Sequence, residues 1–128
     1  MSGRIVLLIE PDRALGGIYV RALERAGYGV MIASSAHEAI LAADHQAPDI
    51  IVMEWELPGH NGGAFLYEMR SHHDWTELPI IIHTSISPQE LEEFSEAFGA
   101  LGVREVLHKS SHRLQTLINR VSEHAPIV

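Results

Sequence analysis

The sequence predicts a three-layer α/β sandwich in which helices cover both faces of a five-stranded parallel sheet. Short apolar segments alternate with amphipathic ones along the chain. Three apolar segments, residues 4–9, 50–53 and 80–83, are near-continuous runs, which is typical of strands buried on both faces of a parallel sheet. Since crossovers between parallel strands are right-handed almost without exception, we expect the strand order 2-1-3-4-5.

Turn and capping residues indicate where the helices and strands begin and end. Gly27 marks the end of the first helix as a left-handed cap. Ser35 with Glu38, and Ser87 with Glu90, have the spacing of capping boxes that open the second and fourth helices. Strands are expected over residues 4–9, 29–33, 50–53, 80–83 and 103–107. Helices are expected over residues 13–26, from Ser35 until Pro48, from about Asn61, from Ser87 and over residues 112–123.

Apolar residues at helical spacing predict the faces that pack on the sheet. On the first helix these are Leu15, Ile18, Tyr19, Ala22, Leu23 and Ala26. On the fourth they are Leu91, Phe94 and Phe98, and on the last they are Leu114, Leu117, Ile118 and Val121.

Composition narrows the class of protein. The 128 residues, 46% of them hydrophobic, suit one domain with one core over residues 1–128. The absence of cysteine excludes disulfides and thiolate chemistry. No apolar run approaches the ~20 residues that span a bilayer, and no signal peptide precedes the first strand, so a cytoplasmic domain without membrane contact is expected. The net charge of −8 argues against direct nucleic-acid binding.

Polar side chains follow four of the expected strands and should converge, because ligands bind beyond the carboxyl ends of parallel strands. They are Glu10 and Asp12 after the first strand, Glu54 and Glu56 after the third, Thr84 after the fourth and Lys109 after the fifth. This is the layout of a phosphoryl-accepting carboxylate site, although the central carboxylate belongs to a glutamate.

Several segments in register resemble the receiver domain of bacterial two-component response regulators, a flavodoxin-like (βα)5 fold. They are residues 5–10 (IVLLIE), 24–28 (ERAGY), 48–52 (PDIIV), 57–62 (LPGHNG), 78–85 (LPIIIHTS) and 106–109 (VLHK). The resemblance implies two acids that hold magnesium, an aspartate that accepts a phosphoryl group, and a hydroxyl and a lysine that contact the phosphoryl oxygens. It maps the first acid to Glu10, the acceptor to Glu54, the hydroxyl to Thr84 and the lysine to Lys109.

Departures from the family pattern lie at the site. Pro11 stands where the second acid should be and has no side-chain donor for a magnesium ion, which requires near-ideal octahedral geometry. Glu54 carries one methylene more than aspartate, which displaces the nucleophile by about 1 Å and costs on the order of 10²-fold in rate. Val106 and Ser110 replace the aromatic and the proline that the family has near the lysine.

These departures predict a site without a resident cofactor and with at most weak Mg²⁺ binding. If a cation binds, the ligands on offer are Glu10, Glu54 and Glu56. Asp12 has a second interpretation as the N-cap of the first helix. Lys109 is expected to pair with Glu10 and Glu54, because crowded carboxylates need a countercharge. The nine histidines show no metal-ligand spacing, although His60, His83 and His108 could lie near the pocket.

The leading hypothesis is a non-enzymatic, atypical receiver domain (a pseudo-receiver) that binds other signalling proteins or an adjacent output domain without aspartyl phosphorylation. The alternative is a receiver that weakly accepts a phosphoryl group from a histidine kinase. A flavin carrier of the same fold is disfavoured by the acidic turn after the first strand, and a hydrolase by the absence of a nucleophile elbow. The resemblance places the output face on the fourth helix, fifth strand and fifth helix, where glutamates of the helix and nearby arginines could pair across a two-fold axis in a weak homodimer.

Overall fold

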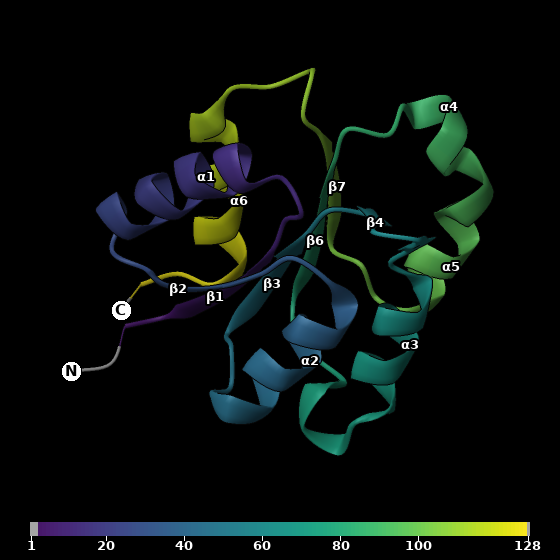
Figure 1. Ribbon diagram of the computed structural model, residues 1–128, viewed down its shortest axis with the longest axis horizontal. Helices are drawn as coiled ribbons and strands as arrows, with labels where there is room; N and C mark the ends of the chain where they lie inside the picture. Colours follow the sequence, from purple (N-terminus) through teal and green to yellow (C-terminus); the bar gives the residue numbers. More distant parts are fainter. Residues whose placement is uncertain (1–2, 128) are drawn as a thin grey trace.

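The computed structural model describes residues 3–127, which form one five-stranded parallel sheet with helices on both faces (Figure 1). The sheet strands are β1 (Ile5–Ile9), β2 (Gly29–Ala33), β3 (Ile50–Met53), β6 (Ile80–Thr84) and β7 (Glu105–His108). Their order is β2-β1-β3-β6-β7, and every pairing is parallel. The predicted fold class and strand order are therefore confirmed.

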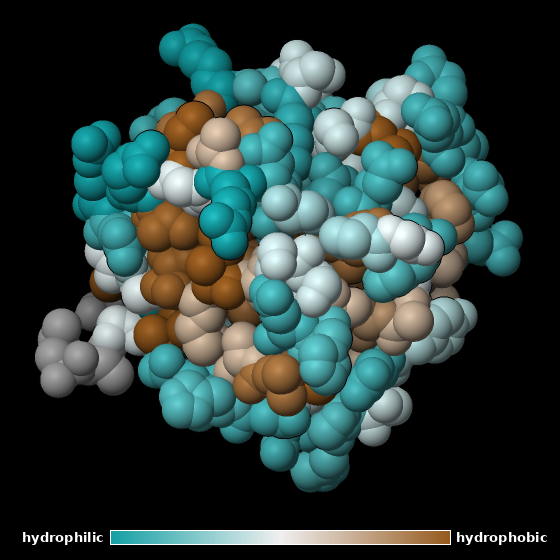
Figure 2. Space-filling model, viewed as in Figure 1, coloured by the Kyte–Doolittle hydropathy of each residue, from teal (hydrophilic) through white to brown (hydrophobic). Residues whose placement is uncertain are grey.

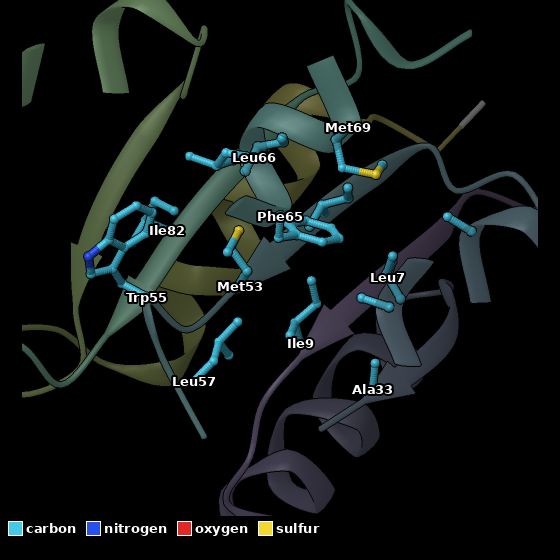
Figure 3. Close-up of a cluster of buried hydrophobic side chains, with 14 of the residues drawn as sticks. Leu7, Ile9, Ala33, Met53, Trp55, Leu57, Phe65, Leu66, Met69 and Ile82 are labelled. Atoms are coloured by element: carbon cyan, nitrogen blue, oxygen red, sulfur yellow. The ribbon is translucent and has the colours of Figure 1, made fainter. Parts of the chain in front are cut away.

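The helices divide between the two faces of the sheet. Helices α1 (Arg13–Arg25) and α6 (Leu114–His124) bury Leu23, Leu117 and Val121 against one face. The other face packs against α2 (Ala36–His45), α3 (Gly63–Ser71) and the segment that contains α4 (Pro88–Leu91), η2 (Glu92–Phe94) and α5 (Ser95–Ala100). A short 3₁₀ helix, η1 (His73–Trp75), lies between α3 and β6. Figure 3 shows side chains from β1, β3 and α3 meeting in the core of this second face.

The predicted caps of α1, α2 and α4 are present. Asp12 accepts a hydrogen bond from the Leu15 N–H at the start of α1, and Gly27 has φ +104° just after its end. Ser35 accepts from the Glu38 N–H, but the Glu38 carboxylate reaches back to the N–H and hydroxyl of Ser34. The boundaries of the first two helices therefore follow from local sequence chemistry.

The predicted fourth helix is interrupted. Residues 88–100 form α4, η2 and α5 in succession. This stretch places four glutamates at positions 90, 92, 93 and 96, where like charges three and four residues apart weaken a helix. Leu91 and Phe98 still pack inward as predicted, and Phe94 is half-buried.

Three predicted inward positions, Ile18, Ala26 and Leu114, are exposed, and one small sheet was not predicted. Ile18 is 42% exposed because it lies at one side of the apolar stripe of α1, and Ala26 is the C-cap residue after that helix. Leu114 is 38% exposed because it is the first residue of α6. Strands β4 (Glu56–Leu57) and β5 (His60–Asn61) pair antiparallel around Pro58 and Gly59. Gly59 has φ +81°, as the third residue of a type II turn requires.

The surface is mostly hydrophilic but has apolar areas. Figure 2 shows a hydrophobic strip over the region of α1 and β2, where Ile32 on the edge strand is 51% exposed. Within residues 3–127 no helix combines the length and hydrophobicity needed to cross a membrane.

Leu66→Ala should destabilise the protein by about 3 kcal/mol, because Leu66 is fully buried between α3 and the sheet. The matched control is Tyr67→Ala, which removes a larger side chain that is 64% exposed and should change stability by no more than about 0.5 kcal/mol. Urea unfolding measures both. Similar losses for the two variants would contradict this core assignment.

Candidate functional site

The candidate site lies at the carboxyl edge of the sheet, where the ends of β1, β3, β6 and β7 meet. Glu10 follows β1, Glu54 follows β3, Thr84 ends β6 and Lys109 follows β7. Glu10 and Glu54 are each 4% exposed and Thr84 is fully buried. The four residues that the sequence assigned to the centre of the site are therefore brought together.

The Lys109 ammonium lies between the two buried carboxylates. Its Nζ is 2.6 Å from Glu10 Oε1 and 2.9 Å from Glu54 Oε1. Burial alone would lower the pKa of Lys109, but its hydrogen bonds to Glu10 and Glu54 outweigh burial and the pKa is raised. The predicted pairing of Lys109 with both acids is thus present.

The Glu54 carboxylate is engaged at both oxygens. Oε2 accepts hydrogen bonds from the Thr84 hydroxyl and from the Glu56 N–H, the latter at 3.0 Å. Oε1 accepts from the Ser85 N–H at 3.1 Å and from Lys109. Burial would raise the pKa of Glu54, but the hydrogen bonds from Thr84, Glu56 and Lys109 outweigh it, so the pKa lies below its ordinary value.

The other two candidate carboxylates do not join this cluster. Asp12 is exposed and its side chain caps α1, which was its second interpretation. Glu56 is also exposed, and its contact with the cluster is through its backbone N–H. The side chains of Asp12 and Glu56 therefore lie outside the hydrogen-bonded cluster that Glu10, Glu54, Thr84 and Lys109 form.

The residues present do not fit a magnesium ion. Glu10 uses Oε1 for Lys109 and Oε2 for the Asp12 N–H, Pro11 offers no donor atom, and Glu54 is saturated. Among residues 3–127 no three acidic or histidine side chains are grouped as metal ligands. An ammonium, rather than a divalent cation, balances the carboxylates in this arrangement.

A histidine pair borders the site and was not predicted. The Nε2 atoms of His83 and His112 are 3.2 Å apart, and the His83 ring meets the Tyr19 ring edge-on at 5.0 Å between centroids. Burial, Lys109 and His112 lower the pKa of His83 to about 3, so it stays neutral at physiological pH. The alternation of side chains along a strand could have predicted that His83 faces α1. No local sequence signal predicts that the loop with His112 approaches it.

His60 and His108 have other surroundings. His108 Nδ1 is 2.9 Å from the Ile86 carbonyl, which ties the end of β7 to the loop after β6. His60 is exposed on β5. Of the three histidines expected near the pocket, His83 is the buried one, and its ring packs against Tyr19, whose ring centroid is 6.0 Å from Lys109 Nζ.

Comparison with known proteins identifies the family of this chain. A family model described as the response regulator receiver domain matches residues 6–122. The chain therefore belongs to the response regulator receiver domain family of two-component systems. Members of this family are signalling modules.

Relatives of known name share part of the sequence. The chain is 27% identical over 85 residues to the phosphate regulon transcriptional regulatory protein PhoB of Pseudomonas aeruginosa. The aligned region covers 66% of this chain and 37% of that protein. It is 32% identical over 77 residues to the transcriptional regulatory protein KdpE of Staphylococcus aureus, covering 60% of this chain and 32% of that protein. The matched regions are between 18% and 37% of the length of the first curated relatives.

Solved structures show the same fold over almost the whole chain. A putative response regulator from Chloroflexus aurantiacus superimposes with a TM-score of 0.83 at 25% identity, covering 97% of this chain and 98% of that one. The chemotaxis protein CheY4 of Vibrio cholerae gives a TM-score of 0.82 at 23% identity, covering 96% of this chain and 99% of that one.

Lys109→Met should destabilise the protein by about 3–5 kcal/mol at pH 7, because it leaves two buried carboxylates without a countercharge. In the unaltered protein the lowered pKa of Glu54 contributes stability above about pH 4.5 that is lost as pH falls through the folded-state pKa. In the variant the dependence of stability on pH should have the opposite sign. Burial without Lys109 favours the protonated acid, so stability should rise as the pH falls from 7 to 5.

Urea unfolding at pH 7, 6 and 5 measures this reversal. Arg113→Met, which removes an exposed cation from the neighbouring loop, is the matched control and should leave the pH profile unchanged. A Lys109→Met variant whose stability does not rise between pH 7 and pH 5 would contradict the assigned role of the ammonium.

Proposed function

We propose that this chain is an atypical receiver domain that acts as a protein-interaction module without aspartyl phosphorylation. The observation that carries the proposal is the saturation of the Glu54 carboxylate by Thr84, Ser85, Glu56 and Lys109. A nucleophile must present a free oxygen to an incoming phosphoryl group in near-attack geometry. Glu54 is buried, and both of its carboxylate oxygens accept hydrogen bonds from neighbouring residues.

We also infer that Glu54 stands in for a phosphorylated aspartate. The resemblance to the family assigns Thr84 and Lys109 to contacts with phosphoryl oxygens. Both groups contact the Glu54 carboxylate, whose additional methylene extends it toward them. A permanent carboxylate in this place favours one fixed arrangement of the loop after β6 over a switch between two.

The alternative is a receiver that is phosphorylated weakly by a histidine kinase. The retention of Glu10, Thr84 and Lys109 at one site supports it. The proline at position 11 and the engaged Glu54 oxygens weigh against it. The phosphorylation experiment below separates the two.

The remaining parts of the proposal concern context. We propose one receiver-like domain over residues 1–128, located in the cytoplasm, without catalytic activity of its own and without direct nucleic-acid contact. Its partners would be other signalling proteins or an output domain. The match to transcriptional regulatory proteins such as PhoB covers a minority of their length, which fits a domain that works with a separate output unit.

Incubation with acetyl phosphate and Mg²⁺ should leave the intact mass of the protein unchanged, because Glu54 has no free oxygen and Pro11 supplies no metal ligand. Intact mass spectrometry reads the result. A stoichiometric gain of one phosphoryl group would establish the alternative.

Two variants test separately whether phosphorylation lacks a well-placed nucleophile or a metal ligand. Glu54→Asp alone should remain unmodified, whereas Glu54→Asp combined with Pro11→Asp restores both the nucleophile and a metal ligand and should gain the phosphoryl group. Mg²⁺ affinity, measured by titration, should rise only when Pro11 is replaced. Tight Mg²⁺ binding by the unaltered chain would refute this division.

Self-association through α4–η2–α5, β7 and α6 should be weak and salt-sensitive. Exposed Glu92 and Glu96 lie on one segment of this face and exposed Arg104 and Arg113 on another, so a two-fold axis could pair them. Arg120 is already engaged, 2.8 Å from Glu105. Because exposed ion pairs contribute only ~0.2–1 kcal/mol each, association should disappear at high salt.

Sedimentation at low and high salt measures this association, with Arg113→Glu as the disrupting variant. Arg25→Glu is the control, since it makes the same charge change at the end of α1. A monomer at high concentration and low salt would exclude the homodimer.

A further inference from the structure

A cleft of about 460 Å³ opens between the β4–β5 hairpin and the α4–η2 segment, beside the Glu54 site. Its apolar lining consists of Trp55, Leu57, Ile86 and Phe94. Over the α4 end of the molecule, Figure 2 shows hydrophobic atoms surrounded by hydrophilic ones. The volume lies within the range of pockets that hold small ligands, which gives room for a few side chains of a partner.

The rim of this cleft is acidic. Glu56 lies on the hairpin, and Glu90 and Glu93 lie on the opposite wall, and all three are exposed. Within residues 3–127, Glu56 and Glu93 have no ion-pair partner. The sequence has no lysine or arginine between positions 26 and 69 or between 71 and 103, so no cation of the adjoining segments offsets these charges.

A buried donor without a partner lies at the apolar wall of the cleft. Trp55 is 3% exposed and its indole Nε1 has no hydrogen-bond partner, the one such side-chain atom among the described residues. The benzo edge of the indole faces α3, since a Cβ on Gly62 would lie 3.1 Å from Trp55 Cε3. The nitrogen is on the opposite edge, and Figure 3 shows it directed away from the rest of the core cluster.

An unsatisfied buried donor is costly and uncommon in folded proteins, and it is satisfied when an acceptor reaches it. The Trp55 ring also packs against the Phe94 ring in a tilted arrangement, with ring centroids 5.1 Å apart and an interplanar angle of 58°, and Phe94 lines the cleft itself. A small shift of Phe94 on the interrupted α4–η2–α5 segment would therefore open a path from the cleft to the indole nitrogen.

We propose that this cleft binds a peptide segment of a partner protein in which arginine or lysine side chains alternate with apolar ones. The cations would pair with Glu56, Glu90 and Glu93, the apolar side chains would pack on Leu57, Ile86 and Phe94, and a backbone carbonyl would accept from Trp55 Nε1. The proposal deepens the interaction role by naming the partner's chemistry, and it rests on that role.

The test is a titration of the ¹⁵N-labelled full chain with a blocked hexapeptide of alternating arginine and leucine. The chain has two tryptophans, Trp55 and Trp75, and Trp75 lies in η1 before β6, at the other end of the sheet. The indole N–H signal of Trp55 should shift in a saturable manner, whereas that of Trp75 should not. A matched hexapeptide of alternating glutamate and leucine should shift neither.

Two double variants with the same change in charge, one inside the cleft and one outside it, test whether the peptide binds at the cleft. Glu56→Gln with Glu93→Gln should weaken peptide binding about three- to tenfold, the effect of two partly exposed ion pairs. Glu92→Gln with Glu96→Gln, on exposed positions of the same segment outside the cleft, should change it less than about twofold. Added salt should weaken binding to the unaltered chain.

Three results would overturn the proposal: no shift of Trp55 at millimolar arginine–leucine peptide, equal effects of the two double variants, or a Trp55 shift that follows protein concentration without peptide. The last would assign the cleft to a second copy of this chain. A negative titration would leave the outcome with acetyl phosphate unchanged, so failure of this inference and failure of the proposed function can be told apart.

Discussion

The ammonium of Lys109, held between two buried carboxylates, is the interaction on which the site depends. Glu10 and Glu54 come from strands that are neighbours in the sheet, and both lie in a region from which water is almost excluded. Without a cation between them, two ionised acids could not share this space, because burial disfavours the charged form. With Lys109 in place, the remaining lone pairs can be used for hydrogen bonds to β6 and to the turn after β3.

The proposal that Glu54 stands in place of the acceptor aspartate of the receiver family is consistent with this arrangement. The longer side chain needs partners beyond those next to its own backbone, and Thr84 and the Ser85 N–H supply them from the end of β6. Proline at position 11 is compatible with the same solution, since Glu10 meets Lys109 and no second acid has to be neutralised. Glu54, Pro11 and Lys109 are therefore mutually compatible at this site.

Sequence reasoning reached the sheet order and the four central site residues because they depend on repeating patterns. Buried strands appear as apolar runs, and the polar residues that follow them must meet at one edge of a parallel sheet. It failed where the outcome depends on the direction of one side chain or on a contact distant in sequence. Asp12 and Glu56, each three residues after the end of a sheet strand, have exposed side chains, and His83 meets a loop residue 29 positions later. The β4–β5 hairpin had a local signal, the Pro58–Gly59 pair, but its strands are too short to show alternation.

The bonds made by Glu54 also govern how the molecule opens. One carboxylate joins the end of β3 to the loop after β6 and, through Lys109, to the ends of β7 and β1. A fluctuation that frees any one of these loops must break bonds that the others share. The carboxyl edge of the sheet is thus a single cooperative unit, in which loops far apart in sequence gain and lose their order together. At the amino edge, by contrast, the Asp49 carboxylate links the start of β3 to that of β1, through the Ile5 N–H and Arg4, and does not reach β6 or β7.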